Sequence, residues 1–138
     1  MKKPKKTITE HEEQVAVVSW AESASVVCHE LALLFAVPNA GNRHIRYAMK
    51  MRAEGLQSGV PDLFLPVARQ GSHGLFIEMK RKGATPGLNG KLSEAQKAWI
   101  EALRGQGYRV EMCIGAEEAI AVLKDYCSLG WMENGGAA

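Results

Sequence analysis

Apolar and polar residues alternate with a helical period over the first part of the chain. The pattern begins at Thr9 and continues to about Ala36, which predicts one long helix. Thr9 and Glu12 match a capping box, in which the hydroxyl and the carboxylate each satisfy a free backbone N–H. One face of this helix should turn toward the core, and its members are Glu13, Val17, Trp20, Ala21, Ala24, Val27 and Leu31. Glu13 therefore heads the buried face, while Glu12 is explained by capping.

The centre of the chain changes to the two-residue period of a β-hairpin. A turn-rich loop at 38–42 and a helical pattern over 43–54, ended by Gly55, come first. After a turn at 59–61, Asp62 begins one strand, and Leu75–Lys80 is the second strand beyond a tip at 70–74. We expect the two strands to lie side by side.

The last third of the chain alternates helix and strand. A loop at 83–90 precedes a helix capped by Ser93 that runs to Arg104, then a strand over 108–114 and a helix over 116–126. The order helix, strand, strand, helix, strand, helix predicts an α/β fold with a mixed sheet flanked by helices.

Length and composition predict a single domain and indicate where in the cell the protein is found. The chain has 138 residues, 46% hydrophobic and 23% charged, as in ordinary globular proteins. We expect a disordered basic arm at 1–8, one domain at 9–128 and a flexible tail at 129–138. Three widely separated cysteines and the absence of any membrane-length apolar run or signal-peptide pattern favour reduced thiols and the cytoplasm, that of the host cell if a phage encodes the protein.

The net charge of +2 does not by itself indicate nucleic-acid binding, but the positive charges are clustered. The clusters are Lys2, Lys3, Lys5 and Lys6; Arg43, Arg46, Lys50 and Arg52; and Arg81, Lys82 and Lys91. Such groups can neutralise phosphates, although each cluster alone could equally be a solvated face.

Three residues of the hairpin carry the candidate chemistry. Alternation along Leu75–Lys80 puts Glu78 and Lys80 on one face, a pattern that in isolation is more typical of a half-exposed strand. Asp62, at the start of the neighbouring strand, changes this interpretation. Cross-strand carboxylates on one face lie close enough to share a hard divalent cation, and the Lys80 ammonium beside it could orient water and counter developing negative charge.

These residues resemble a known nuclease family. Gly59-Val60-Pro61-Asp62, then Ile77-Glu78-Met79-Lys80, then the S-x-x-Q of a helix start at Ser93 are similar to the virus-type replication-repair nucleases (VRR-NUC) of the PD-(D/E)xK superfamily. The resemblance extends from about Glu10 to Val122. It implies a restriction-endonuclease-like αβββαβ core, whose third strand we expect either within 67–72 or before Asp62.

The resemblance also implies a metal site. Its catalytic residues would be Asp62, Glu78, Lys80, Gln96 and Glu13, and its ligands to Mg²⁺ or Mn²⁺ would be Asp62, Glu78, the Met79 carbonyl and Glu13, directly or through water. The glutamate of the first helix maps to Glu13, with Glu10 as the alternative. A first-turn acid favoured by the helix dipole is a further interpretation of Glu13. Gln96 could close a capping box with Ser93, orient Glu78 or Lys80, or do both.

DNA contacts are expected around this site. Asn39, Asn42 and Arg43 resemble a segment of phage members of the family, although turn chemistry explains them equally well. The other candidates for DNA binding are Arg46, Lys50, Arg81 and Lys82.

The function implied is metal-dependent endonuclease action on DNA, on branched substrates such as Holliday junctions and as a homodimer. Two alternatives stay open. One is a non-catalytic nucleic-acid-binding protein that keeps the nuclease fold, and the other is a restriction-type nuclease that cuts plain duplex. Cleavage assays on duplex, flap and junction DNA distinguish them.

Overall fold

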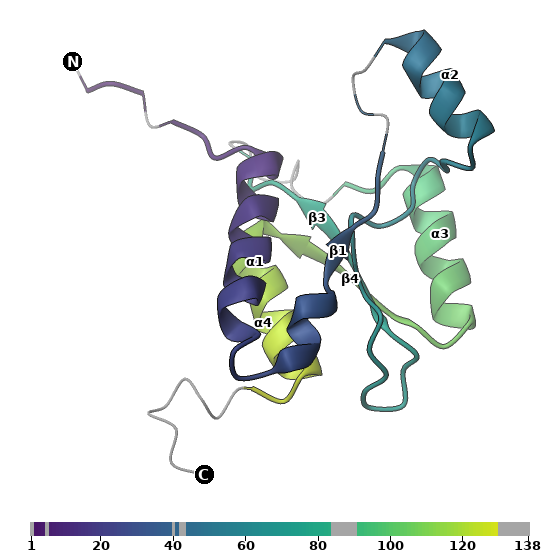
Figure 1. The fold of residues 1–138 in the computed structure, drawn as a ribbon. Helices are drawn as coiled ribbons and strands as arrows, with labels where there is room; N and C mark the ends of the chain where they lie inside the picture. Colours follow the sequence, from purple (N-terminus) through teal and green to yellow (C-terminus); the bar gives the residue numbers. More distant parts are fainter. Residues whose placement is uncertain (1, 5, 40, 42–43, 84–90, 130–138) are drawn as a thin grey trace.

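One four-stranded sheet organises the protein, seen in a computed structural model that describes residues 2–4, 6–39, 41, 44–83 and 91–129 (Figure 1). The elements are, in chain order, α1 (Glu10–Ala24), the 3-10 helix η1 (His29–Leu33), β1 (Phe35–Ala36), α2 (Ile45–Ala53), β2 (Leu63–Leu65), β3 (Leu75–Lys80), α3 (Glu94–Gly105), β4 (Arg109–Ile114) and α4 (Gly115–Tyr126). The strands lie in the order β1-β2-β3-β4.

The sheet is mixed, as predicted. β1 pairs with β2 and β2 with β3 in antiparallel fashion, whereas β3 and β4 are parallel and joined through α3. Helices α1 and α4 lie together on one side of the sheet, α3 lies on the other, and α2 projects away from the sheet (Figure 1). The predicted α/β class and restriction-endonuclease-like arrangement are therefore confirmed.

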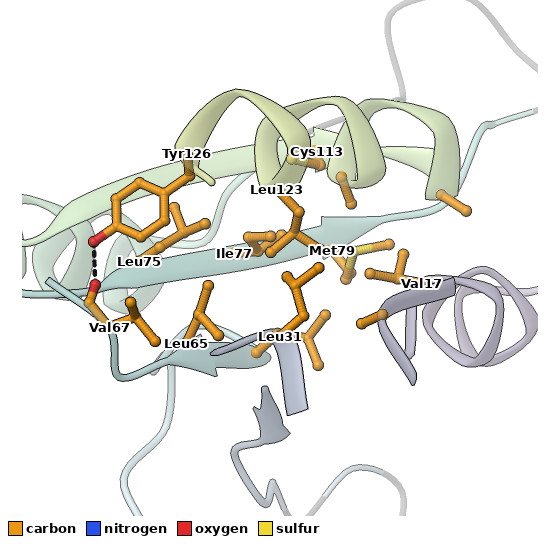
Figure 2. Packing of buried hydrophobic residues seen from close by; sticks show 14 of the residues in the cluster. Val17, Leu31, Leu65, Val67, Leu75, Ile77, Met79, Cys113, Leu123 and Tyr126 are labelled. Atoms are coloured by element: carbon orange, nitrogen blue, oxygen red, sulfur yellow. Dashed lines mark hydrogen bonds between the residues drawn. The ribbon is translucent and has the colours of Figure 1, made fainter. Parts of the chain in front are cut away.

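The hydrophobic core lies between the sheet and the α1–α4 pair (Figure 2). Leu75, Ile77 and Met79 of β3 are completely buried there, as alternation along the strand predicts. The Tyr126 hydroxyl at the end of α4 donates a hydrogen bond to the Val67 carbonyl, which satisfies the polar end of an otherwise buried ring. Among the described residues, no helix is both long and apolar enough to cross a membrane.

The prediction of one helix from Thr9 to Ala36 is wrong in its second half. The capping box at Thr9 is present, but α1 ends at Ala24, and η1 and β1 occupy the remainder. Val27, assigned to the buried face, is 55% exposed. The expected third strand is β1, which precedes Asp62. It has two residues and is held by pairing with β2, so its stability comes from a distant segment rather than from local pattern.

Other predicted boundaries shift by a few residues. α2 begins at Ile45 rather than Arg43, because the His44 side chain accepts a hydrogen bond from the Arg46 N–H and so caps the helix. Leu129, assigned to a flexible tail, is 9% exposed and belongs to the core. Residues 130–138 of that tail lie outside the described residues.

Candidate active site

Two carboxylates face each other at the open end of the β2–β3 hairpin. The register pairs Leu63 with Ile77, and extending it by one residue puts Asp62 opposite Glu78. Asp62 is 8% exposed and Glu78 2% exposed. The Met79 N–H donates to Asp62 Oδ2 at 2.7 Å, which fixes this side chain against the neighbouring strand. The hairpin therefore brings together the two acids that the sequence analysis singled out.

The charged forms of these acids are disfavoured. Burial raises the pKa of Glu78 to about 8, with a further contribution from the nearby Asp62 charge, and Lys80 opposes both. Burial also raises the pKa of Asp62, against the opposing hydrogen bond from Met79. Two buried acids in contact can both ionise only if a positive charge compensates them.

Lys80 and Gln96 complete the cluster. The Gln96 Nε2 donates to Glu78 Oε1 at 2.8 Å, and Lys80 Nζ donates to Gln96 Oε1 at 3.0 Å. Lys80 Nζ lies 3.9 Å from Glu78 Oε1. The amide of Gln96 thus holds the carboxylate and the ammonium in a fixed relation to each other.

Gln96 also caps α3, so both predicted roles are present. Its Oε1 accepts from the Ser93 N–H at 2.9 Å, and its own N–H donates to Ser93 Oγ at 3.1 Å. The capping box therefore sets the position of the Gln96 side chain before any substrate arrives.

Gly59 explains how α3 comes so close to the acids, a role that its place in the Gly-Val-Pro-Asp motif does not by itself predict. Its φ is +90°, and a Cβ at this position would lie 2.6 Å from the Ala95 backbone. Only glycine permits that approach. The signal in the sequence was the glycine three residues before Asp62.

The two acids of the first helix lie in different surroundings. Glu13 is 8% exposed, and its Oε2 accepts a hydrogen bond from the Ala116 N–H in the first turn of α4. Glu10, by contrast, is close enough to Asp62 and Lys80 to interact with both. Desolvation and the Asp62 charge raise the pKa of Glu10, while Lys80 and Arg81 lower it. The structure therefore places Glu13 against the start of α4, and it brings Glu10, the alternative first-helix acid, together with Asp62 and Lys80.

A cleft of about 910 Å³ lies between α1 and the segment 38–51, which includes part of α2. Glu10 and Gln14 line it on one side, Asn39 and Tyr47 on the other, and Asp62 lies within it. Its volume is within the range of small-molecule sites, and it gives access to Asp62, whereas Glu78 is not among its lining residues.

The predicted DNA-binding residues lie on several segments, and among those described only Asn39 lines the cleft. Arg46 and Lys50 are exposed on α2, and Arg81 and Lys82 are exposed just after β3. Arg81 interacts with Glu10, whereas Lys82 lies over Gly115 next to Glu13. Of the Pro38 loop, Asn39 lines the cleft, and Asn42 and Arg43 lie outside the described residues.

The donors of the acid pair fit a hard divalent cation. Within the described part of the chain, no group of three or more histidine, cysteine, aspartate or glutamate side chains is placed to hold a metal ion. Mg²⁺ does not require such a group, because it is usually bound through one or two carboxylates together with water and phosphate. The buried Asp62–Glu78 pair offers this donor set, and its raised pKa values show that burial outweighs the compensation that Lys80 provides.

A family profile and a solved structure both relate this chain to proteins with a VRR-NUC domain. The profile of the VRR-NUC domain matches residues 5–117. Among solved structures, one described as a VRR_NUC domain protein superposes with a TM-score of 0.70 at 28% sequence identity, covering 91% of this chain and 93% of the other. No functionally curated protein matches the chain.

Proposed function

The chain belongs to the VRR-NUC domain family, and from this premise we propose that it is a Mg²⁺-dependent endonuclease that hydrolyses DNA phosphodiester bonds at the Asp62–Glu78 pair. The observation that carries the proposal is the pair itself: two buried carboxylates opposite each other on paired strands, with Lys80 and Gln96 attached. A module that only binds DNA has no use for buried acids, which repel phosphate.

In this proposal each residue has a separate task. Asp62 and Glu78 hold Mg²⁺ or Mn²⁺, with the Met79 carbonyl as a further ligand. The bound cation would lower the pKa of water and stabilise the departing oxygen. Lys80 orients the attacking water and counters charge that grows on the phosphate. Gln96 keeps Lys80 and Glu78 in place.

Glu10 rather than Glu13 is the first-helix acid of the proposed site. Its electrostatic interaction with Asp62 and Lys80 supports an outer role, through water bound to the cation. Glu13 would then act only through structure, by fixing α1 against α4.

We further propose that the substrate is branched DNA, such as a four-way junction, cut by a homodimer. Arg46, Lys50, Arg81 and Lys82 would contact phosphates, as would Asn39, Asn42 and Arg43 of the preceding loop. Ile45 and Met49, one helical turn apart on α2, are 69% and 61% exposed and offer an apolar surface to a second copy.

Cleavage of labelled duplex, flap and four-way junction DNA tests these proposals. With Mg²⁺ or Mn²⁺ we expect products, and with EDTA none. Asp62→Ala should lower the rate by about a thousandfold or more, because it removes several kcal/mol of transition-state stabilisation. Lys80→Ala should also be strongly impaired. Glu22→Ala, which changes an exposed acid further along the same cleft, is the matched control and should cut normally.

The outcomes separate the alternatives. DNA binding without cleavage under every metal would favour the non-catalytic binding protein. Equal cutting of plain duplex at defined sequences would favour a restriction-type nuclease.

A further inference from the structure

A second, apolar pocket lies beside the segment that leads into Asp62, since Val60 lines it. It has a volume of about 460 Å³ and opens between the residues after β1, the C-terminal end of α2 and α3. Its apolar lining consists of Val37, Met51, Leu56, Val60 and Trp99, each partly buried. The volume falls in the range of about 300–1,000 Å³ that is typical of small-molecule sites.

This apolar pocket is attached directly to the catalytic segment. The Val37 N–H donates to the Asp62 carbonyl at 2.8 Å. Val60 precedes Asp62 by two residues, roughly 7 Å along an extended chain. A group bound at the acids is therefore within a short reach of the pocket.

A polar pocket of about 240 Å³ adjoins the apolar pocket, because Leu56, Gln57 and Val60 line both. Asp62 and Gln96 of the acid cluster also line the polar pocket, and so does Arg52, which adds a positive charge. The two adjoining pockets thus offer an acid of the proposed metal site, a cation, polar groups, and an apolar lining with the Trp99 indole and the Glu54 carboxylate at its edge.

A single nucleotide carries chemical groups that match these linings. Its phosphate suits the metal-binding acids and Arg52, its sugar suits the polar pocket, and the flat face of its base suits Trp99 and the aliphatic side chains. A base within a duplex is already stacked and paired, and extracting it costs a few kcal/mol, least where it is unpaired. The pocket therefore favours DNA that already has an unpaired base.

Resting on the proposed nuclease function, we propose that this pocket holds one unpaired nucleobase adjacent to the scissile phosphate, with Trp99 as its stacking surface. The protein would then select branched or flapped DNA by reading an unstacked nucleotide rather than by overall shape alone.

The test measures binding of the full-length protein with Ca²⁺ in place of Mg²⁺, because Ca²⁺ also binds carboxylate oxygens and so compensates the acid pair, and the recovered DNA is checked to be uncut. The DNA is a duplex branch with one unpaired 2-aminopurine, compared with the same DNA carrying an abasic nucleotide there. We expect 2-aminopurine fluorescence to be quenched by the wild type, and the abasic DNA to bind about tenfold more weakly. Trp99→Ala should abolish the quenching and bind both DNAs equally weakly.

Trp20→Ala is the matched control. Trp20 lies on α1 with the Lys124 ammonium 5.8 Å from its ring centroid, on the α4 side of the sheet, so its removal should leave the base dependence unchanged. Equal affinity of the wild type for the abasic and base-containing DNA would overturn the proposal, and this comparison needs no variant that could unfold.

The two proposals fail separately. Loss of base dependence would leave metal-dependent cleavage standing. Base-dependent binding by a protein that never cuts would instead contradict the nuclease function and leave the pocket in place.

Discussion

The two faces of strand β3 differ as much as any two regions of the molecule, although their residues alternate along one segment. On the α1–α4 side, Leu75, Ile77 and Met79 are fully buried in a continuous apolar core. On the other side, Phe76 stacks on Phe64 with ring centroids 4.1 Å apart, and Glu78 and Lys80 follow toward the candidate active site. A shift of one residue in register would exchange the two sets.

The difference shows which part of the molecule offsets the free-energy cost of burying the active-site acids. Burying the Asp62–Glu78 pair without a cation is unfavourable, as the raised pKa values indicate. We call the face of β3 that carries Leu75, Ile77 and Met79 the closed face, and the face that carries Glu78 and Lys80 the open face. Hydrophobic burial on the closed face holds the hairpin in register, whichever residues the open face carries. Stability and chemistry are thus separable on adjacent residues, and this separation can be tested.

The largest effect is expected from Glu78→Gln on the open face. Cleavage should fall about a thousandfold, since an amide cannot supply the anionic ligand. Because the pKa of Glu78 is about 8, this group is largely neutral in the metal-free protein at pH 7. In the unfolded chain the same carboxyl is ionised at pH 7, so keeping it neutral in the fold costs free energy, and an amide does not have this cost. We therefore expect Glu78→Gln to raise the free energy of unfolding of the metal-free protein at pH 7 by roughly a few kcal/mol. Chemical denaturation beside a cleavage assay measures both.

Ile77→Ala, one residue away on the closed face, is the reciprocal control. It should lower the free energy of unfolding by roughly 2–5 kcal/mol, while the folded fraction cuts DNA at nearly the wild-type rate. A Glu78→Gln protein that unfolds as readily as Ile77→Ala would contradict the division between the faces.

Much of this hairpin could be predicted from the sequence. Period-two alternation fixed which residues of 75–80 share a face, and the Pro61-Asp62 turn located the partner acid. Both signals are local, because each depends on neighbouring residues and on strand geometry. The capping box at Ser93 was predictable for the same reason.

What the sequence could not give depends on distant contacts. Glu13 was correctly expected to be buried, but its partner is an N–H of α4, 103 residues further along the chain. A helical pattern reports that a side chain faces inward and not what it meets there. A third strand before Asp62 was one of two expected places, but residues 35–36 themselves were assigned to a helix, because two residues carry no period and are held in place by pairing with β2.

A smaller effect is expected from pH on the metal-free protein. The pKa of Glu78 is raised from 4.5 to about 8, and that of Asp62 is raised as well. The stability that the neutral Glu78 carboxyl contributes is therefore fully present below pH 4.5, and it is lost as the pH rises through about 8. We expect the free energy of unfolding in EDTA to fall by roughly a few kcal/mol between pH 5 and 9, and Mg²⁺ to restore most of it at the alkaline end.

Variants from the two faces sharpen this expectation. Ile77→Ala should shift the whole pH profile downward with its slope retained, whereas Glu78→Gln should flatten it. Identical slopes for the wild type and Glu78→Gln, measured by urea denaturation at each pH, would assign the pH dependence to other groups.

The smallest effects are expected at the start of α3, where one residue serves both stability and chemistry. Gln96→Ala removes the hydrogen bonds to Glu78 and Lys80 and also breaks the capping box. Ser93→Ala breaks the capping box alone. We expect Ser93→Ala to cost about 1 kcal/mol of unfolding free energy and to leave cleavage within a few-fold of wild type.

Gln96→Ala should lose a similar amount of stability and, in addition, about 10- to 100-fold in cleavage rate or in Mg²⁺ affinity, because the carboxylate and the ammonium are no longer held together. Titrating Mg²⁺ in a cleavage assay separates the two losses. If Ser93→Ala impairs cleavage as strongly as Gln96→Ala, then the position of the helix rather than the amide would control the site. If only Gln96→Ala does so, the amide orients Glu78 and Lys80 directly, and the open face depends on a polar contact that the closed face does not need.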